Sequence, residues 1–234
     1  MSIFVLGDTH LSLSVEKPMD VFGSRWRNYT DKLKDGWCST VKSDDTVVIP
    51  GDISWAMTLE EALEDFKFLN ALPGKKIIGK GNHDYWWGTR KKTEAFFMVN
   101  GIDSIELLMN NAYLRDGKLI CGSRGWFTDD KNAPDNADYE KIMNREAMRL
   151  KASFDYGAGL SSDAEKLCFL HFPPLFGDFI AEEIINVIVQ NGVKRCWYCH
   201  LHSVYDIPQS ISYKGVEFIL SSSDYLNFIP LKIL

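Results

Sequence analysis

Short apolar runs alternate with amphipathic segments along the chain, and this alternation limits the possible folds more than any other feature. The runs are "SIFVLG", "DTVVIPG", "KKIIGKG", "GKLICGS", "KLCFLH", "VKRCWYC" and "VEFILSSS". Each contains consecutive apolar residues followed by a polar break, a pattern typical of strands that are covered on both faces. Strands that alternate with helices form layered α/β domains, so we predict that fold class.

The segments between the runs carry the periodicity of helices with one apolar side. They span residues 24–40, 58–69, 138–155 and 178–192. The second begins with Thr58 three residues before Glu61, which is the pattern of a capping box. Residues 125–166 lack a strand signal. We therefore expect a helical excursion there, over one end of the sheet, within a single domain of residues 1–234.

Charge and length argue against some classes of function. The 234 residues carry a formal net charge of −6, which argues against a broad basic surface for nucleic acid. No apolar stretch is long enough to span a membrane, and the N-terminal "MSIFVLGDTH" lacks the basic region of a signal peptide. We expect a cytoplasmic protein without a membrane partner, and the five cysteines fit that reducing compartment.

Two cysteines belong to the sequence "CWYCH", which matches the patterns for haem attachment and for a thiol redox pair. The segment that contains them has the character of a strand, in which positions i and i+3 lie about 10 Å apart and point to opposite faces. A disulfide needs Cα atoms within about 7 Å of each other. We therefore predict that Cys196 and Cys199 are two buried thiols.

Polar side chains that can bind metal follow the ends of several apolar runs. They include all five histidines, and they are Asp8, His10, Asp52, Asn82, His83, Asp84, His171, His200 and His202. In open α/β sheets, ligands bind beyond the carboxyl ends of the strands. The paired residues in "GDTH" and "CHLH" are two positions apart, so each pair can share one face of extended backbone. Any one of these residues alone fits a core histidine or a turn, but together they predict one site.

The chemistry of this set indicates a metal centre. Imidazole and carboxylate groups without a thiolate suit Mn, Fe, Zn, Co or Ni better than Cu(I) or an iron–sulfur cluster. Seven residues are candidate ligands: Asp8, His10, Asp52, Asn82, His171, His200 and His202. Seven ligands are too many for one four-coordinate ion, and they fit two ions that share a bridging ligand.

The motifs "GDTH", "GD", "GNHD", "LHFPP" and "CHLH" resemble those of the calcineurin-like metallophosphoesterases. That family has D-x-H, G-D, G-N-H-D, H and G-H-x-H in the same order. The resemblance implies a four-layer sandwich of two facing mixed β-sheets flanked by helices. The sequence departs from the family at Cys199, which stands where the last motif usually has glycine. If that glycine normally has a positive φ, the turn before His200 must differ.

The resemblance also implies a two-metal centre with divided ligands. One ion would take Asp8, His10, Asp52 and His202, and the other would take Asp52, Asn82, His171 and His200. Asp52 would bridge two divalent transition-metal ions, with Mn, Fe and Zn as candidates. A metal-bridging hydroxide would attack a phosphate ester, with diesters preferred over monoesters.

The resemblance gives His83 and Asp84 catalytic roles. His83 would point toward the departing oxygen as a proton donor or charge stabiliser. Asp84 would hydrogen-bond the other ring nitrogen of His83 and keep the ring oriented and cationic. Three adjacent residues in "GNHD" would then serve three different roles.

Further residues are candidates for substrate recognition. Arg124 follows "GKLICGS" and could clamp a phosphate oxygen, with a surface or structural ion pair as the alternative. Trp126 and Phe172 lie beside a strand end and a motif residue and could stack on a base or an aryl leaving group. Core or rim packing is the alternative for both, as it is for the aromatic residues of "DYWW".

Two other functions are compatible with these motifs. A nuclease would use the same centre, although the net charge of −6 counts against it. A catalytically silent interaction scaffold on the same fold would be expected to lack His83 or several ligands, and none is missing. We expect the partner to be a small phosphate ester, with nucleotides among the candidates.

Overall fold

Two mixed β-sheets form the centre of the structure. The computed structural model describes residues 1–128 and 136–234. The first sheet has the strand order β13-β1-β2-β3-β4, with β1 at Ile3–Val5, β2 at Thr46–Ile49, β3 at Lys75–Ile78, β4 at Ile105–Leu107 and β13 at Leu231–Lys232. The second has the order β11-β12-β10-β7-β6-β5, with β5 at Ala112–Arg115, β6 at Lys118–Ser123, β7 at Glu165–Leu170, β10 at Arg195–Tyr198, β11 at Ser210–Tyr213 and β12 at Val216–Leu220. A separate hairpin pairs β8 at Leu175–Phe176 with β9 at Phe179–Ile180.

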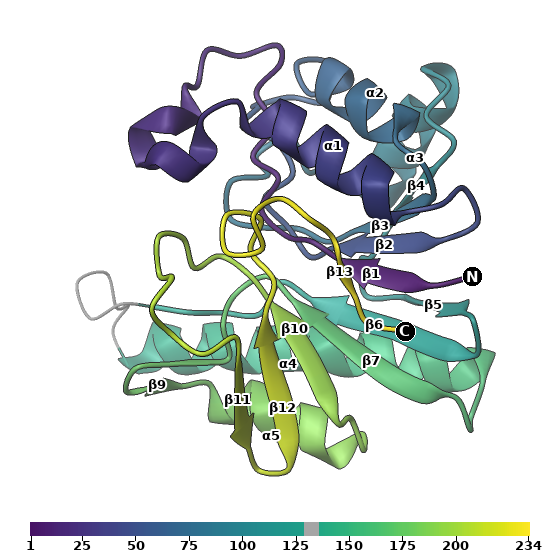
Figure 1. The fold of residues 1–234 in the computed structure, drawn as a ribbon. Coiled ribbons are helices and arrows are strands. Elements are labelled where there is room, and N and C mark those ends of the chain that lie inside the picture. The colour runs from purple at the N-terminus through teal and green to yellow at the C-terminus, as the bar shows by residue number, and fades with distance from the viewer. Residues whose placement is uncertain (129–135) are drawn as a thin grey trace.

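Helices cover the outer face of each sheet (Figure 1). The first sheet carries α1 at Tyr29–Thr40, α2 at Leu63–Ala71 and α3 at Arg90–Val99, with the short helices η1 at Met19–Phe22 and η2 at Ser24–Trp26 before them. The second sheet carries α4 at Asn136–Leu160 and α5 at Glu182–Gln190. The predicted four-layer α/β sandwich with two mixed sheets is confirmed.

Residues of the central strands divide between apolar layers. Ile3 and Val5 of β1 lie between the two sheets, whereas Phe4 packs in the layer that contains α1, α2 and α3. In the second sheet, Phe169 of β7 lies between the sheets and Cys168 packs on the side of α4 and α5. Because both faces of these strands are buried, they need apolar residues at every position.

All the predicted apolar runs form strands, and the strands that the sequence did not reveal are short or lie at sheet edges. They are β4, β5, β8, β9, β11 and β13. The edge strand β11, Ser210–Tyr213, is exposed at every second position. It therefore lacks the continuous apolar run that marks a strand buried on both faces.

Three helices begin later than predicted. The helix expected over 178–192 begins at Glu182, because Phe179–Ile180 form strand β9 instead. The segment 24–40 divides into η2 and α1 at Asn28, whose φ is 51°. The helix expected from Thr58 begins at Leu63, and a turn precedes it. Only part of the capping box forms there: the Glu61 amide donates to Thr58 Oγ1 at 3.2 Å, while the Glu61 carboxylate accepts from the Met57 amide at 2.8 Å.

The expected helical excursion at 125–166 contains a long helix, and its residues 129–135 lie outside the described part of the chain. The helix is α4, which contacts β5, β6 and α5. Its residues Met143, Leu150 and Phe154 are fully buried in the core of the second half. The helix thus forms part of an outer layer of the sandwich, because it covers the face of the sheet as the connection between β6 and β7.

Loops that follow the parallel strands of the two sheets meet at one edge of the sandwich. The Gly7 amide, just beyond β1, donates to the Ser221 carbonyl, just beyond β12, at 2.8 Å. The loop after β10 also approaches Gly7 closely because residue 7 has no side chain: a Cβ there would lie 2.6 Å from both Cβ and Sγ of Cys199. The fold therefore brings motif residues from both sheets to the same edge.

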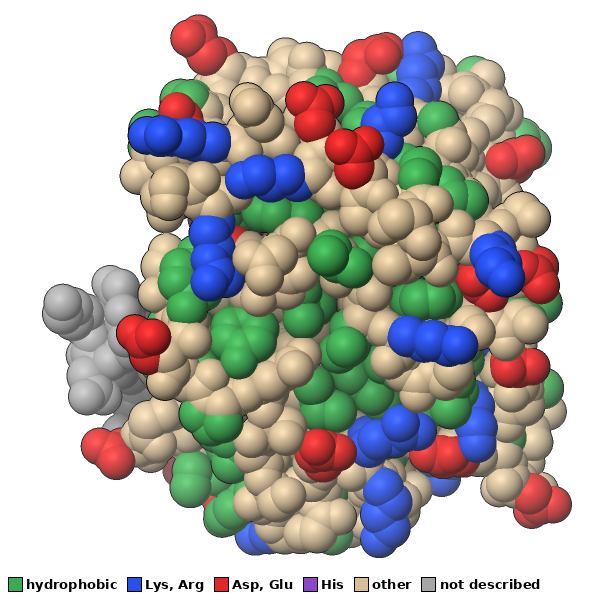
Figure 2. All heavy atoms as spheres, in the orientation of Figure 1, with side chains coloured by type: hydrophobic (Ala, Val, Ile, Leu, Met, Phe, Trp, Pro, Cys, Tyr) green, Lys and Arg blue, Asp and Glu red, His purple; other side chains and the backbone are tan. Residues whose placement is uncertain are grey.

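Charged side chains of both signs are interspersed on the face of the molecule shown in Figure 2, without a continuous basic stripe. Within residues 1–128 and 136–234, no helix has the length and apolar character needed to cross a membrane.

Two glycine substitutions in helices are expected to change stability in opposite directions. A Cβ at Gly36 in α1 would lie 2.5 Å from the Phe228 carbonyl oxygen, whereas a Cβ at Gly159 in α4 would have no neighbour within 4 Å. We predict that Gly36→Ala lowers the free energy of unfolding by about 1–3 kcal/mol through overpacking. Gly159→Ala should raise it by up to about 1 kcal/mol through helix propensity. Urea unfolding of both variants checks this, and a stabilised Gly36→Ala protein would contradict the close approach.

Candidate metal centre

Several candidate ligands have an unusual backbone conformation. Asp8, His10, Asp52 and His200 have φ values of 58°, 44°, 52° and 75°. Residues other than glycine rarely adopt this left-handed region, and those that do are concentrated at functional sites. The turns that carry these residues are thus held in place by the surrounding structure.

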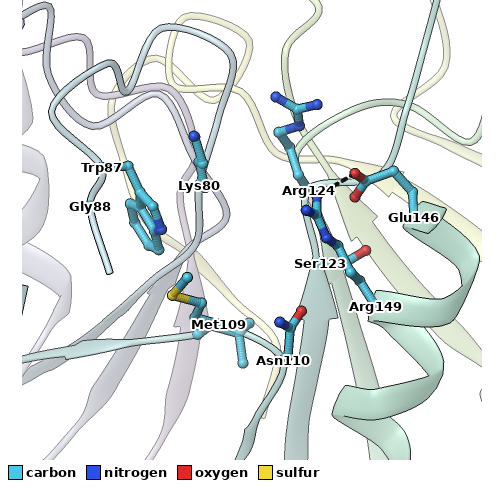
Figure 3. Close-up of a pocket in the computed structure, with 10 residues that line it drawn as sticks. Lys80, Trp87, Gly88, Met109, Asn110, Ser123, Arg124, Glu146 and Arg149 are labelled. Carbon is cyan, nitrogen blue, oxygen red and sulfur yellow. Dashed lines mark hydrogen bonds and ion pairs between the residues drawn. The ribbon is translucent and has the colours of Figure 1, made fainter. Parts of the chain in front are cut away.

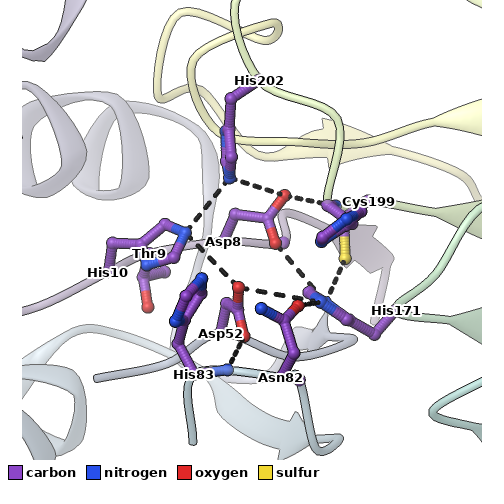
Figure 4. A network of polar contacts seen from close by, with 12 residues as sticks. Asp8, Thr9, His10, Asp52, Asn82, His83, His171, Cys199 and His202 are labelled. Atoms are coloured by element: carbon purple, nitrogen blue, oxygen red, sulfur yellow. Dashed lines mark hydrogen bonds and ion pairs between the residues drawn. The ribbon is translucent and has the colours of Figure 1, made fainter. Parts of the chain in front are cut away.

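One cluster contains Asp8, His10 and His202 (Figure 4). The Nε2 atoms of His10 and His202 lie 3.1 Å apart, and His202 Nε2 is 3.8 Å from Asp8 Oδ2. That carboxylate oxygen also accepts a hydrogen bond from the His200 amide at 2.7 Å. The loops after β1 and β10 therefore converge on one point.

A second cluster contains Asp52, His171 and His200. His171 Nε2 lies 2.7 Å from Asn82 Oδ1 and 3.6 Å from Asp52 Oδ2. The ring centroids of His171 and His200 are 5.2 Å apart. The loops after β2, β3, β7 and β10 supply these side chains. Together, the two clusters and Asn82 account for all seven candidate ligands.

Asp52 lies between the two clusters. Its Oδ2 atom is 3.5 Å from His10 Nε2 and 3.6 Å from His171 Nε2. Its Oδ1 atom accepts a hydrogen bond from the His83 amide at 2.8 Å, which fixes the carboxylate. A Cβ at Gly81 would overlap this same oxygen, so residue 81 must be glycine for Asp52 to take this position. One carboxylate thus faces both groups of imidazoles.

The donor atoms fit cations. Asp8 Oδ1 and Asp52 Oδ2 are buried and have no hydrogen-bond partner among the described residues. Burial raises the pKa of both carboxyl groups, because an ion is poorly solvated there. Buried polar atoms without partners are unfavourable, and a bound divalent cation would supply the missing partner and favour the ionised carboxylates. The clustered Asp and His residues can therefore hold metal.

The imidazoles are mostly neutral in this environment. Burial lowers the pKa of His10 and His171 well below the usual value, and that of His200 to about 4. A neutral ring keeps a lone pair for a metal. For His202, burial also lowers the pKa, but the carboxylates of Asp8 and Asp224 outweigh it and raise the pKa overall.

Residues that the sequence analysis missed support the ligands. Asp224 Oδ1 lies 2.9 Å from His202 Nδ1, so it orients that ring. Asp224 Oδ2 accepts from the Ser203 amide at 3.0 Å and from the Tyr205 hydroxyl at 2.9 Å. Asp224 follows "VEFILSSS", so the rule of polar residues after strand ends, applied to this run, identifies it.

An aromatic residue, Trp55, also packs against the candidate metal centre. The Trp55 ring stacks on His10, with centroids 4.9 Å apart, and lies 4.2 Å from the His83 ring. No specific signal in the sequence points to this role, because Trp55 lies beyond the "GD" motif and resembles any core aromatic residue.

The structure places Asp84 differently from the prediction. Its buried carboxylate accepts five hydrogen bonds, which come from the amides of Asp52, Ile53, Ser54 and Gly81 and from Trp86 Nε1, at 2.7–3.3 Å. His83 Nδ1 has no hydrogen-bond partner among the described residues. The expected contact between Asp84 and the His83 ring is therefore wrong, because the Asp84 side chain faces the backbone of the loop after β2.

The predicted protonation of His83 also differs. Burial, followed by the nearby charges of His202 and Lys17, lowers the pKa of His83 to about 4. Burial raises the pKa of Asp84 to about 6, although the N–H groups that it accepts from oppose this. Without an adjacent anion, the His83 ring is neutral at pH 7 in this arrangement and not cationic as expected.

The three candidate substrate residues lie together on the side of the second cluster. Arg124 lies over the faces of Trp126 and Phe172, with its guanidinium carbon 5.7 and 5.6 Å from the ring centroids. The Phe172 ring is buried and lies 4.9 Å from the His171 ring and 4.6 Å from the His200 ring. Phe172 therefore packs against ligands, while Arg124 has cation–π contacts and no carboxylate partner among the described residues.

Cys199 is accommodated without a positive φ, which instead occurs at His200. Its buried thiol lies 3.5 Å from His171 Nδ1 and also packs against Gly7. Cys196 and Cys199 are both free and buried, as predicted. Burial and the nearby carboxylates of Asp8 and Asp52 raise the pKa of the Cys199 thiol.

The match to a protein family agrees with this arrangement of metal-binding groups. A family model described as calcineurin-like phosphoesterase matches residues 1–204. The chain therefore belongs to the calcineurin-like phosphoesterase family, and it is a metal-binding hydrolase of the class that acts on phosphoric esters. No curated protein matches the chain in sequence.

Solved structures share the fold at low sequence identity. A protein of unknown function, AQ665 from Aquifex aeolicus, has a TM-score of 0.53 and 16% identity, over 99% of this chain and 95% of that one. Phosphopantetheinyl hydrolase (PptH) from Mycobacterium tuberculosis has a TM-score of 0.54 and 14% identity, over 100% and 95%. TT1561 from Thermus thermophilus has a TM-score of 0.56 and 13% identity, over 95% and 89%. These similarities extend over the whole sandwich.

We predict that Asp84→Asn destabilises the protein even without metal. The asparagine amide nitrogen would face backbone N–H groups and leave at least one of them unpaired, which costs about 1–3 kcal/mol. The metal-free variant should melt roughly 2–10 °C lower than the metal-free parent. Asp155→Asn is the control, because the Asp155 side chain is 60% exposed. Equal melting temperatures for Asp84→Asn and the parent would contradict the role of this carboxylate.

Proposed function

We propose that the protein is a two-metal phosphoesterase that prefers phosphodiesters. The observation that carries this proposal is the position of Asp52 Oδ2, which lies 3.5 Å from His10 Nε2 and 3.6 Å from His171 Nε2. A carboxylate placed between two groups of imidazoles is suited to bridge two cations. Asp8, His10 and His202 would complete one ion's ligands, and Asn82, His171 and His200 would complete the other's.

The donor set suits divalent Mn, Fe or Zn, because it combines imidazole nitrogen with carboxylate and amide oxygen. When bound, two such ions acidify a water molecule and stabilise the charge on the phosphoryl oxygens. The protein's own contribution is to fix the ligands before the ions arrive. Asp224 holds His202, the His83 amide holds Asp52, and the Asp8 carboxylate accepts from the His200 amide.

His83 is positioned to act on the leaving group. Its ring centroid is 5.6 Å from that of His10, so it lies beside the metal ligands, and it belongs to neither ligand cluster. Trp55 limits its movement from one side. We propose that a bound phosphate ester, through its negative charge, raises the pKa of the His83 ring, so that His83 can donate a proton to the departing oxygen or stabilise charge there.

Two observations support a diester as substrate. The chain has the histidine of the "GNHD" motif. Members of the calcineurin-like family that have this histidine use it to help an alkoxide depart. One structural neighbour is named a phosphopantetheinyl hydrolase, and phosphopantetheinyl groups are linked through phosphate. We propose a small-molecule diester, and we further propose a cytoplasmic location because the cysteines are free.

The alternatives predict different measurements. A nuclease would degrade single-stranded DNA or RNA at rates above those for small diesters. A silent scaffold would not turn over bis(4-nitrophenyl) phosphate with added Mn²⁺. Turnover of the small diester, with little action on polynucleotides, is the outcome that we expect.

We predict that Asp52→Ala loses both metal ions, because it removes the ligand that the two clusters share. The wild-type protein should hold two equivalents of Mn²⁺ or Zn²⁺ after loading and gel filtration, a ratio of about one ion per cluster. Elemental analysis measures the metal content. Asp155→Ala, on the exposed side of α4, is the control and should keep the wild-type content. If Asp52→Ala retained two equivalents, Asp52 would not be the bridge.

We predict that His83→Ala keeps both ions and loses turnover in a manner that depends on the leaving group. General acid catalysis typically contributes about 10² to 10⁴-fold. The loss should be small for a nitrophenyl ester, because nitrophenolate departs without a proton, and large for a diester with an alkoxide leaving group. Metal content and rates on both substrates check this.

A ligand variant, His202→Ala, is the matched control for the His83 prediction. It should lower the metal content and slow both substrates by similar factors. If His83→Ala behaved in this way too, His83 would belong among the ligands and would not be the proton donor.

A further inference from the structure

A cavity of about 270 Å³ opens beside the metal centre, between the two halves of the sandwich (Figure 3). Lys80 and Trp87, from the loop after β3, line one side of it. Arg124, just after β6, and Arg149, from α4, line the opposite side, and the connection between β4 and β5 contributes Asn110. Each half of the fold thus contributes positive charge to the same cavity.

The positive charge in this cavity is only partly neutralised. Glu146 is the sole carboxylate among the described residues that line it. Its Oε1 atom lies 2.6 Å from Arg149 Nη1, so it fixes that guanidinium. Lys80 and Arg124 have no hydrogen-bond or ion-pair partner for their side chains in residues 1–128 and 136–234. Arg124 Nε is also buried without a partner.

The Arg124 side chain is held in place while its N–H groups are left unused. Trp126 and Phe172 contact its guanidinium through their ring faces, at 5.7 and 5.6 Å. The Phe172 amide donates to the Arg124 carbonyl at 2.9 Å, which ties the two loops together. A guanidinium that is fixed in this way can bind a tetrahedral anion through paired hydrogen bonds with little loss of conformational entropy.

The cavity adjoins the metal centre through two residues. The Phe172 ring contacts the Arg124 guanidinium and also the His200 and His171 rings. Lys80 is two residues before Asn82. A ligand whose ester group lies at the metal centre can therefore extend a second group into the cavity.

We propose that this cavity binds a second phosphate group of the substrate, so that the natural substrate carries one phosphate ester at the metals and another phosphate beside it. The inference rests on the proposed phosphoesterase function. Lys80, Arg124 and Arg149 would all contact the second phosphate. A phosphate suits the cavity better than a carboxylate, because it presents more acceptor oxygens to three cations that converge from both sides.

Phosphate binding by the metal-free protein tests the cavity independently of catalysis. In the presence of a chelator, calorimetric titration with inorganic pyrophosphate should show one site per chain. Lys80→Gln should weaken this binding about tenfold, a loss of about 1.4 kcal/mol. Arg149→Gln should do the same, but it leaves the buried Glu146 with only the more distant Arg145, whose Nε lies 4.0 Å away, so the folding of this variant is checked by thermal melting. The Lys80 side chain has no such partner among the described residues, so Lys80→Gln leaves no buried carboxylate unpaired and a loss of binding can be assigned to the cavity.

Lys151→Gln is the matched control, because Lys151 lies on α4, is 61% exposed and pairs with Asp155 outside the cavity. It removes the same charge from the protein and should leave pyrophosphate binding unchanged. Absence of binding to the wild-type protein, or equal weakening in the Lys80→Gln and Lys151→Gln variants, would overturn the proposal.

A matched pair of substrates tests whether the second phosphate belongs to the substrate. The dinucleotides ApA and pApA differ by one terminal phosphate. With metal-loaded enzyme, the KM for pApA should be at least tenfold lower than that for ApA, and this ratio should fall toward one in Lys80→Gln but persist in Lys151→Gln. Equal KM values in the wild type, despite pyrophosphate binding, would mean that the cavity takes free anions and would overturn the substrate role. If the wild type hydrolysed no ester at all, the proposed function would be wrong. The pyrophosphate titration would still show whether the cavity binds phosphate.

Discussion

The Asp84 carboxylate holds together the part of the structure on which the metal centre depends. It accepts hydrogen bonds from three successive amides after β2, from the Gly81 amide after β3 and from the Trp86 indole. A buried carboxylate that accepts several N–H groups can remain in place without a cationic partner. The loop that presents Asp52 and the loop that presents Asn82 and His83 are thereby fixed relative to each other before any ligand binds.

The candidate metal centre contains groups whose close approach is unfavourable in the absence of a cation. Two buried carboxylates lie among imidazoles, and one oxygen atom of each lacks a hydrogen-bond partner among the described residues. Four of the candidate ligands also have left-handed backbone conformations. Such an arrangement persists only when the surrounding structure fixes it, and here the apolar layers of the sandwich provide that support. The stability of the fold is thus used to hold ligands in a geometry that bound cations would favour.

The aromatic residues around the centre connect it to the cationic cavity. Trp55 packs on His10 and His83, and Phe172 packs on His171 and His200. Phe172 also makes a cation–π contact with Arg124. Aromatic rings can contact imidazole and guanidinium groups without competing for their hydrogen bonds. They therefore fix these polar groups while leaving them free to bind a substrate.

Much of the fold and the identity of the candidate ligands follow from the sequence. Strands buried on both faces need continuous apolar runs, and parallel strands bring their carboxyl ends to one edge. Both the apolar runs and the polar residues that follow them can be recognised in short segments of sequence. The following strands, and the polar residues after most of them, could therefore be predicted directly: β1, β2, β3, β6, β7, β10 and β12. The sequence analysis did not predict edge strands such as β11, in which every second residue is exposed to solvent.

Contacts between loops were decided by the tertiary structure alone. The sequence placed Asp84 beside His83, but a tight turn sends adjacent side chains in different directions, and Asp84 faces the loop after β2. The roles of Asp224 and Trp55 depend on which strands are neighbours in each sheet, because His202 and Asp224 follow β10 and β12, and His10 and Trp55 follow β1 and β2. The role of Lys80 depends on how the two sheets pack, because both halves line its cavity. Sequence thus determined which chemical groups stand at the strand ends, and the packing of the two sheets determined which of those groups meet.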